Sequence, residues 1–257
     1  MRRQPDQGLL LAAVLMAAGA TPAAAREPAS WQADLDAGVS ILPGRDTQWS
    51  DFAISLGRVG PETVTAAQIQ RARRFGRSEY LIGARHEHRI DDALDLYGGF
   101  AIGTGNRFLP DWRIDAGLSQ RVSRTAAHTD LLRFGAGIAR YGQGTVITLM
   151  PGAMRYFASR NAFIGIDAIA VDAPDARWRF GARGQAGFDL NRRLAARAWL
   201  GIAPETERGR TEIVRSAALG LIVSGARRRS FRLTLAGENR AIGPDRVTVS
   251  IGITQAF

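Results

Sequence analysis

Apolar and polar residues alternate along most of this chain. The clearest run extends from Arg177 to Leu190, where the odd positions hold Arg, Gly, Gln or Asp and the even positions hold Trp, Phe, Ala, Gly or Leu. Successive side chains of a β-strand point to opposite faces, so a period of two predicts a strand with one apolar and one polar face.

The same alternation recurs from residue 33 to the C-terminus, interrupted by short turn sequences such as Pro43-Gly44 and Asn191-Arg192. Pro151 predicts a bulge or irregularity within one strand, and the polar stretch 203–209 predicts a loop. No helical spacing occurs after residue 25. The expected strands are 33–42, 52–56, 62–74, 79–89, 93–103, 112–122, 132–141, 145–157, 164–170, 177–190, 194–202, 211–224, 230–238 and 246–257.

We therefore expect an all-β fold, and the choice is between a soluble sheet and a barrel. Alternation alone does not separate the two, because a soluble sheet buries its apolar face whereas a transmembrane barrel turns that face to lipid. The apolar sets are mostly small or medium aliphatic residues, which suit lipid better than a close-packed core. Aromatic residues lie near expected strand ends, as in interfacial girdles: Trp49, Tyr80, Trp112, Trp178, Phe188 and Phe231.

The fold class that these features favour is a single antiparallel up-and-down transmembrane β-barrel of about fourteen strands, within a range of roughly 12–16. The first 25 residues predict a cleaved signal peptide: Arg2 and Arg3 precede an apolar run, Gly8–Ala20, which is too short to span a bilayer and is followed by Ala23-Ala24-Ala25. An uncleaved anchor helix is the alternative. Residues 26–257 are then one outer-membrane barrel domain.

The last strand carries its own signal. Val249, Ile251, Ile253 and the terminal Phe257 share one face. This arrangement resembles the C-terminal strand of bacterial outer-membrane barrels, in which a terminal Phe and alternate apolar residues are recognised by the assembly machinery. Gln255 departs from that pattern, because the third residue from the end is usually apolar or aromatic.

The amino-acid composition shows that the chain lacks cysteine and carries a large positive charge. The 257-residue chain contains no Cys, so it has no disulfide framework and no thiolate site. Its net charge is +10, and every one of the 34 basic residues is Arg. The export signal and the absence of a nucleic-acid motif argue against nucleic-acid binding. Arg holds carboxylates and phosphates in fixed geometry, so we expect it in the lumen or against lipopolysaccharide phosphates.

Two further stretches carry a family resemblance. Arg73-Arg74-Phe75-Gly76 and Asn106–Trp112, together with the strand rhythm and Phe257, resemble the YaiO-type family of outer-membrane β-barrels. The resemblance covers most of the chain after residue 25. It implies an outer-membrane barrel associated with surface polysaccharide, and it supplies no catalytic residues.

Candidate chemistry outside the lumen is sparse. A lipid hydrolase would pair a His with a Ser and an acidic or amide residue at the rim. His86 and His88 share the lipid-facing parity, Ser119 has the opposite parity, and no Gly-x-Ser-x-Gly motif occurs. His86-x-His88 places two imidazoles on one face, but no third metal ligand is visible. We therefore expect no catalytic residues, no metal site and no cofactor.

The inward-facing set is richer, and two interpretations of it remain open. Its residues line a wet, anion-preferring conduit, or they pair across the lumen and fill it as a structural barrel. The candidates are Arg85, Glu87, Arg113, Asp115, Arg121, Arg133, Asp167, Arg179, Arg183, Gln185, Arg197, Arg232 and Glu238.

The sequence thus predicts a monomeric barrel in the outer membrane with both termini in the periplasm. We expect it to act as a small anion-preferring pore or as a component of surface polysaccharide export. A lipid-modifying hydrolase and a structural barrel are the alternatives. The expected partners are outer-membrane lipid and lipopolysaccharide, the assembly machinery, and an anionic glycan.

Overall fold

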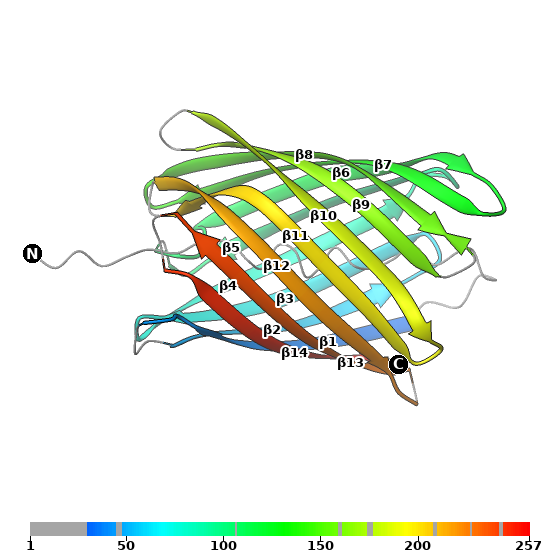
Figure 1. Cartoon of the computed structure of the whole chain (residues 1–257), viewed down its shortest axis with the longest axis horizontal. Helices are drawn as coiled ribbons and strands as arrows, with labels where there is room; N and C mark the ends of the chain where they lie inside the picture. The colour runs from blue at the N-terminus through cyan, green and yellow to red at the C-terminus, as the bar shows by residue number, and fades with distance from the viewer. Residues whose placement is uncertain are drawn as a thin grey trace, which may run out of the picture.

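The computed structural model describes residues 30–44, 48–105, 107–158, 161–173, 177–207, 210–226, 228–241 and 244–257, so the expected signal peptide lies outside the described residues. In this part of the chain, fourteen antiparallel strands form a closed barrel (Figure 1). The strands are β1 (Ser30–Ile41), β2 (Gln48–Val59), β3 (Thr63–Arg74), β4 (Arg77–Arg89), β5 (Leu94–Gly103), β6 (Trp112–Arg124), β7 (His128–Tyr141), β8 (Gly144–Phe157), β9 (Ala162–Asp172), β10 (Trp178–Asn191), β11 (Leu194–Glu207), β12 (Arg210–Ser224), β13 (Arg229–Arg240) and β14 (Arg246–Ala256).

Each strand pairs with its neighbours in sequence, and β1 closes the barrel against β14. That closing ladder runs from the pair Gln32 and Ala256 to the pair Ile41 and Val247. Closure leaves no free sheet edge, as an apolar bilayer requires. The prediction of an up-and-down barrel of about fourteen strands is confirmed. No helix of the described residues has the length and hydropathy to cross a membrane.

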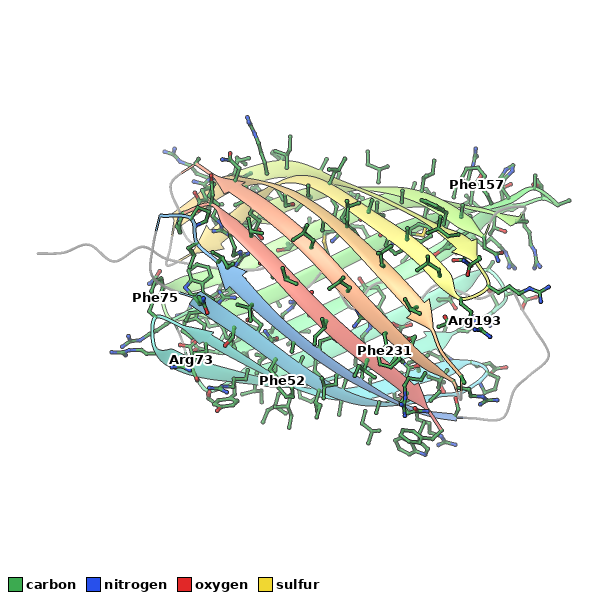
Figure 2. The ribbon with its side chains drawn as sticks, turned by 60° about the horizontal axis from the view of Figure 1, so that its bottom comes forward. Phe52, Arg73, Phe75, Phe157, Arg193 and Phe231 are labelled. Carbon is green, nitrogen blue, oxygen red and sulfur yellow. The ribbon has the colours of Figure 1, made fainter. Side chains whose placement is uncertain are left out.

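The two strand faces differ as the alternation predicts. Apolar side chains stay exposed on the outer surface, for example Phe180 (72 %), Leu219 (67 %) and Ile251 (57 %), and Figure 2 shows such side chains around the wall. Charged residues of the opposite parity reach across strands to one another inside the barrel. The apolar face therefore meets lipid, and the polar face lines the lumen.

The two ends of the barrel have different connections. The end that holds Ser30 and Ala256 has short turns, the longest being four residues, whereas the opposite end carries the segments 42–47 and 104–111. Outer-membrane barrels place short turns in the periplasm and longer loops outside. We refer to the two ends as the terminal end and the loop end.

The structure corrects one local prediction and confirms another, the irregularity at Pro151. The prediction of a loop is wrong over 203–207, because β11 continues to Glu207 and this part pairs with β12, from Ala203 with Val214 to Glu207 with Arg210; residues 208 and 209 lie outside the described residues. Pro151 produces an irregularity and no bulge. The β8–β9 ladder has no pairs at residues 150 and 151 but resumes in the same register at Gly152 and Asp167, since proline lacks the amide hydrogen that the ladder needs.

Candidate functional site in the barrel lumen

The lumen wall carries ion pairs between residues that are two positions apart in the sequence. Arg85 lies 2.6 Å from Glu87 on β4, and Arg113 lies 2.5 Å from Asp115 on β6. Residues i and i+2 share a strand face, so each pair forms along its own strand. All four side chains keep about a third of their surface exposed, and pairs at this exposure contribute little to stability.

One carboxylate is shared by two guanidinium groups. Asp167 on β9 lies 2.5 Å from Arg133 on β7 and 2.8 Å from Arg183 on β10. Asp167 is only 5 % exposed, whereas both arginines are 18 % exposed and reach the lumen. In the amide orientation that satisfies both of its polar atoms, Gln185 accepts a hydrogen bond from Arg133 at 2.7 Å. This group therefore presents a net positive charge to the lumen.

The remaining predicted lumen residues lie on the inner face of other strands. Arg197 lies 3.7 Å from Asp189 and places its guanidinium carbon 5.2 Å from the Phe163 ring centroid. Arg232 pairs with Asp36, which lies two strands away on β1. Arg121 and Arg179 are partly buried at positions of the inward-facing parity.

Inward-facing glycines make room for the side chains of Tyr97 and Arg197 against the barrel wall. A Cβ at Gly117 would lie 2.5 Å from the Tyr97 hydroxyl, and one at Gly135 would lie 2.8 Å from it. A Cβ at Gly187 would lie 2.5 Å from both Arg197 and Phe163. Contacts this short are forbidden to real side chains, so Tyr97 and Arg197 occupy space that only glycine leaves free. We call these positions glycine seats.

A cavity with a volume of about 150 Å³ lies beside Tyr97 and the Arg113–Asp115 ion pair. Its polar lining includes Gln68, Gln70, Arg85 and Tyr97, and the Arg85 guanidinium carbon lies 4.5 Å from the Tyr97 ring centroid. A volume of roughly 10–15 Å³ holds one water, so this part of the lumen has room for several waters or one small solute.

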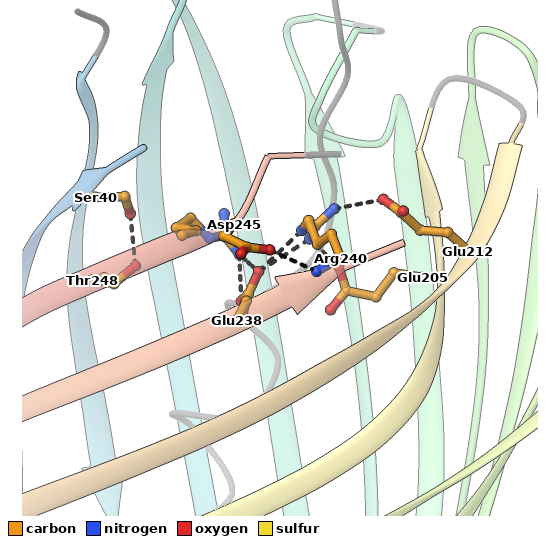
Figure 3. Close-up of polar contacts among 8 residues, drawn as sticks. Ser40, Glu205, Glu212, Glu238, Arg240, Asp245 and Thr248 are labelled. Carbon is orange, nitrogen blue, oxygen red and sulfur yellow. Dashed lines mark hydrogen bonds and ion pairs between the residues drawn. The ribbon is translucent and has the colours of Figure 1, made fainter. Parts of the chain in front are cut away.

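Towards the loop end, the lumen is occupied by a buried charged layer (Figure 3). Arg240 on β13 is 3 % exposed and pairs with Glu205 from β11, with Glu212 from β12 at 3.3 Å, and with Glu238 at 3.2 Å. Glu238, which is 1 % exposed, also accepts hydrogen bonds from Arg246 at 2.6 and 2.7 Å. Nearby, the Ser40 and Thr248 hydroxyls are hydrogen-bonded at 2.8 Å.

Trp49 extends this layer across to β3. Its ring centroid lies 5.6 Å from the guanidinium carbon of Arg246 and 5.5 Å from that of Arg74. Arg74 is 3 % exposed and lies 3.6 Å from Asp51. The girdle assignment of Trp49 is therefore wrong, since Trp49 is only 3 % exposed and stacks between cations inside the barrel.

The loop between β5 and β6 completes the layer. Glu79 accepts hydrogen bonds from the backbone amides of Arg107, Phe108 and Leu109, at 3.1, 3.1 and 2.8 Å. Phe108 and Leu109 are each 7 % exposed, and the Phe108 ring lies 5.4 Å from the Arg74 guanidinium. The loop is thus folded against the lumen side of the wall. We define the closing layer as Trp49, Arg74, Phe108, Glu205, Glu212, Glu238, Arg240 and Arg246.

The family-motif residues divide between the two faces. Arg73 is exposed on the outer face, whereas Arg74 enters the closing layer. Phe75 and Gly76 have φ angles of +49° and +74°, as in a type I′ hairpin turn. The unfavourable left-handed conformation of Phe75 is accompanied by an edge contact with Trp49, at 5.6 Å between ring centroids.

Of the closing layer, sequence analysis singled out only Glu238 as a lumen residue. Glu212, Arg240 and Arg246 are buried as well, but their convergence depends on how neighbouring strands are staggered. Val249, Ile251, Ile253 and Phe257 are all exposed on the outer face.

His86 and His88 are exposed on the outer face of β4. His86 and His88 stack with ring centroids 6.3 Å apart, and the Nδ1 atom of His86 lies 2.7 Å from the Thr65 hydroxyl. Ser119 has the inward parity of β6, on the other side of the wall from them. Within the described ranges, no group of three or more His, Asp or Glu could hold a metal ion.

Solved structures share the barrel architecture. The CymD monoaromatic hydrocarbon channel superposes with a TM-score of 0.63 at 11 % identity, covering 90 % of this chain and 89 % of that one. An outer membrane channel from Pseudomonas putida F1 gives 0.52 at 11 % identity, covering 93 % and 100 %, and Pseudomonas aeruginosa OpdQ gives 0.50 at 6 %, covering 90 % and 99 %. At these identities the likeness shows the fold alone.

No curated protein matches this sequence. Residues 32–166, just over half of the chain, match the family described as the YaiO membrane beta barrel domain. The match begins in β1 and ends in β9, and it includes the Arg73–Gly76 turn and the loop that carries Phe108. The chain is an outer-membrane β-barrel with a porin-like fold, and it belongs to the YaiO membrane beta barrel family.

Proposed function

We propose that this protein is a narrow outer-membrane conduit that favours small anions over cations. The observation that carries the proposal is the sharing of Asp167 by Arg133 and Arg183. Two partly exposed guanidinium groups facing one buried carboxylate leave a fixed positive charge on the wall, and such a charge raises the local concentration of anions.

The closing layer supports a conduit with restricted passage. Its charged members are 1–13 % exposed and come from β3, β11, β12, β13 and β14, so solute that enters from the terminal end meets packed side chains near the loop end. We propose that passage requires this layer to rearrange, and that the conduit lies within a single chain. The cavity of about 150 Å³ beside Arg85 and Tyr97 is a place within this conduit where a small solute would fit.

Conductance of the refolded protein in planar bilayers under a salt gradient tests the proposal. We expect steps whose reversal potential indicates anion selectivity, and we expect the potential to move towards zero in Arg133→Gln/Arg183→Gln. Arg155→Gln is the matched control, because Arg155 pairs with Asp130 on the outer surface at 2.6 Å.

Cation selectivity, or a reversal potential unchanged by the double substitution, contradicts the proposed selectivity. If the wild type is silent, the same recording is made with Arg240→Met, which removes the centre of the closing layer. A folded barrel that stays silent in both forms contradicts the conduit itself.

A further inference from the structure

A second arginine site lies on the outer surface, near the loop end of β2, β3 and β4. The strand register aligns outward-facing residues of these strands in three tiers. From mid-wall towards the loop end, the tiers are Ile54, Ile69 and Ile82; then Phe52, Arg71 and Tyr80; then Ser50, Arg73 and Ser78.

The first two tiers set the level of the membrane. Ile54, Ile69 and Ile82 are 45, 50 and 54 % exposed, which places them against acyl chains. In the next tier, Phe52 and Tyr80 are 41 and 42 % exposed, and such aromatic side chains mark the interface. The two arginines therefore lie at and just beyond the interface, where lipid phosphates are found.

The two arginines converge on one hydroxyl group. Arg71 donates hydrogen bonds to the Ser78 hydroxyl from Nε at 3.3 Å and from Nη2 at 3.1 Å. Ser78 is the register partner of Arg73, so both cations lie beside one hydroxyl. Two described acids on these strands face the lumen: Asp51 lies against Arg74, and Glu79 binds the 104–111 loop. None of the nine described residues of the three tiers is acidic.

Like charges on one face repel each other, and a cation beside lipid is costly unless it is paired. A phosphate monoester would reduce the repulsion between the two arginines and would pair with each of them, because a guanidinium group can bind two phosphate oxygens at once. The longer connections place this end in the outer leaflet. In Figure 2, Arg73 lies at the opposite end of the barrel from Arg193.

We propose that Arg71 and Arg73, assisted by the Ser50 and Ser78 hydroxyls, bind the phosphate of an outer-leaflet lipid headgroup. The lipid would lie with its acyl chains over the isoleucine tier and its phosphate between the guanidinium groups. This site is on the outside of the wall and is independent of the conduit.

Native mass spectrometry of the full chain in detergent tests the site, with bisphosphorylated lipid A and fully dephosphorylated lipid A as probes. We expect the wild type to retain the phosphorylated form preferentially. Arg71→Gln/Arg73→Gln should weaken retention by about tenfold or more, as expected for loss of charge-assisted bonds. Arg71→Lys/Arg73→Lys keeps the charge but loses the fork, so we expect an intermediate loss.

Arg58→Gln is the matched control, because Arg58 is exposed on the outer face of β2 near the terminal end, opposite Thr65. Heat-modifiable migration in gels verifies that each variant is folded. Equal retention by wild type and the Gln double variant overturns the proposal, as does an equal loss in Arg58→Gln. Complete displacement of the lipid by millimolar inorganic phosphate also overturns it, since the site would then bind free phosphate rather than a lipid.

Discussion

Replacing Arg240 with Met removes the cation at the centre of the closing layer. Arg240 pairs with Glu205, Glu212 and Glu238, whose side chains are 13, 7 and 1 % exposed. After the substitution, Arg246 still pairs with Glu238, but Glu205 and Glu212 lose this guanidinium. Carboxylates held together at such burial repel each other and lack solvent.

Removing one partner of a buried ion pair costs about 3–5 kcal/mol. The β11–β13 ladders do not involve the Arg240 side chain, so the cost falls on the packed arrangement of the layer and less on the barrel. At about 1.4 kcal/mol per factor of ten, the equilibrium between the packed and the rearranged layer should shift by roughly two to four orders of magnitude.

Single-channel recording measures this shift. We expect Arg240→Met to show a much higher open probability than the wild type and a weaker preference for anions, because carboxylates become exposed. Arg232→Met is the control on the same strand, since Arg232 and its partner Asp36 are 25 and 31 % exposed and such pairs contribute at most about 1 kcal/mol. The reasoning is refuted if the two variants gate identically, or if Arg240→Met unfolds at the wild-type temperature with unchanged conductance.

Three further outcomes follow from single positions. Gly117→Val should force the Tyr97 side chain into the lumen, which lowers conductance and costs about 1–3 kcal/mol of stability. Gly184→Ala is the control and should change neither property, because a Cβ at Gly184 has no atom within 4 Å. Equal conductance in the two variants contradicts the proposed packing of Tyr97 against Gly117. Asp167→Asn leaves Arg133 and Arg183 without their carboxylate, so the reversal potential should indicate stronger anion selectivity; a shift towards cations contradicts this. Phe257→Ala should refold in detergent like the wild type, because the Phe257 side chain is 69 % exposed and the hydrogen bond from the backbone amide of residue 257 to the Trp31 carbonyl, at 2.8 Å, is kept. The level of this variant in the outer membrane of cells should fall, and an unchanged level contradicts a role of Phe257 in assembly.

The barrel could be predicted from sequence because its rule is local. In the run 177–190, the polarity of each residue predicts the face on which it lies. In β10 the exposure alternates from Trp178 to Arg183, and the register shifts between Asp189 and Asn191. The same rule predicted that Val249 and Ile251 face lipid. Parity also placed Arg133, Asp167 and Arg183 on one side of the wall, although their sequence spacing gave no reason to expect that they meet.

The closing layer could not be predicted in this way. Arg240 and Glu205 are separated by 35 positions and lie on strands that are not adjacent, so their contact depends on strand tilt and stagger, which alternation does not encode. Trp49 illustrates a second limit. An aromatic residue near a strand end suits either a girdle or the inner wall, and only the placement of Arg74 and Arg246 decides between them.

The glycine seats have a consequence for how the bore is defined. Tyr97 and Arg197 occupy the space that a Cβ at Gly117 or Gly187 would fill, so a larger residue at either glycine would have to displace them. In a lumen whose long side chains project freely, the width fluctuates with each rotamer change. Here the position of each side chain depends on a single glycine, so we expect substitutions of increasing size at Gly117, Gly135 or Gly187 to change the width of the lumen in steps.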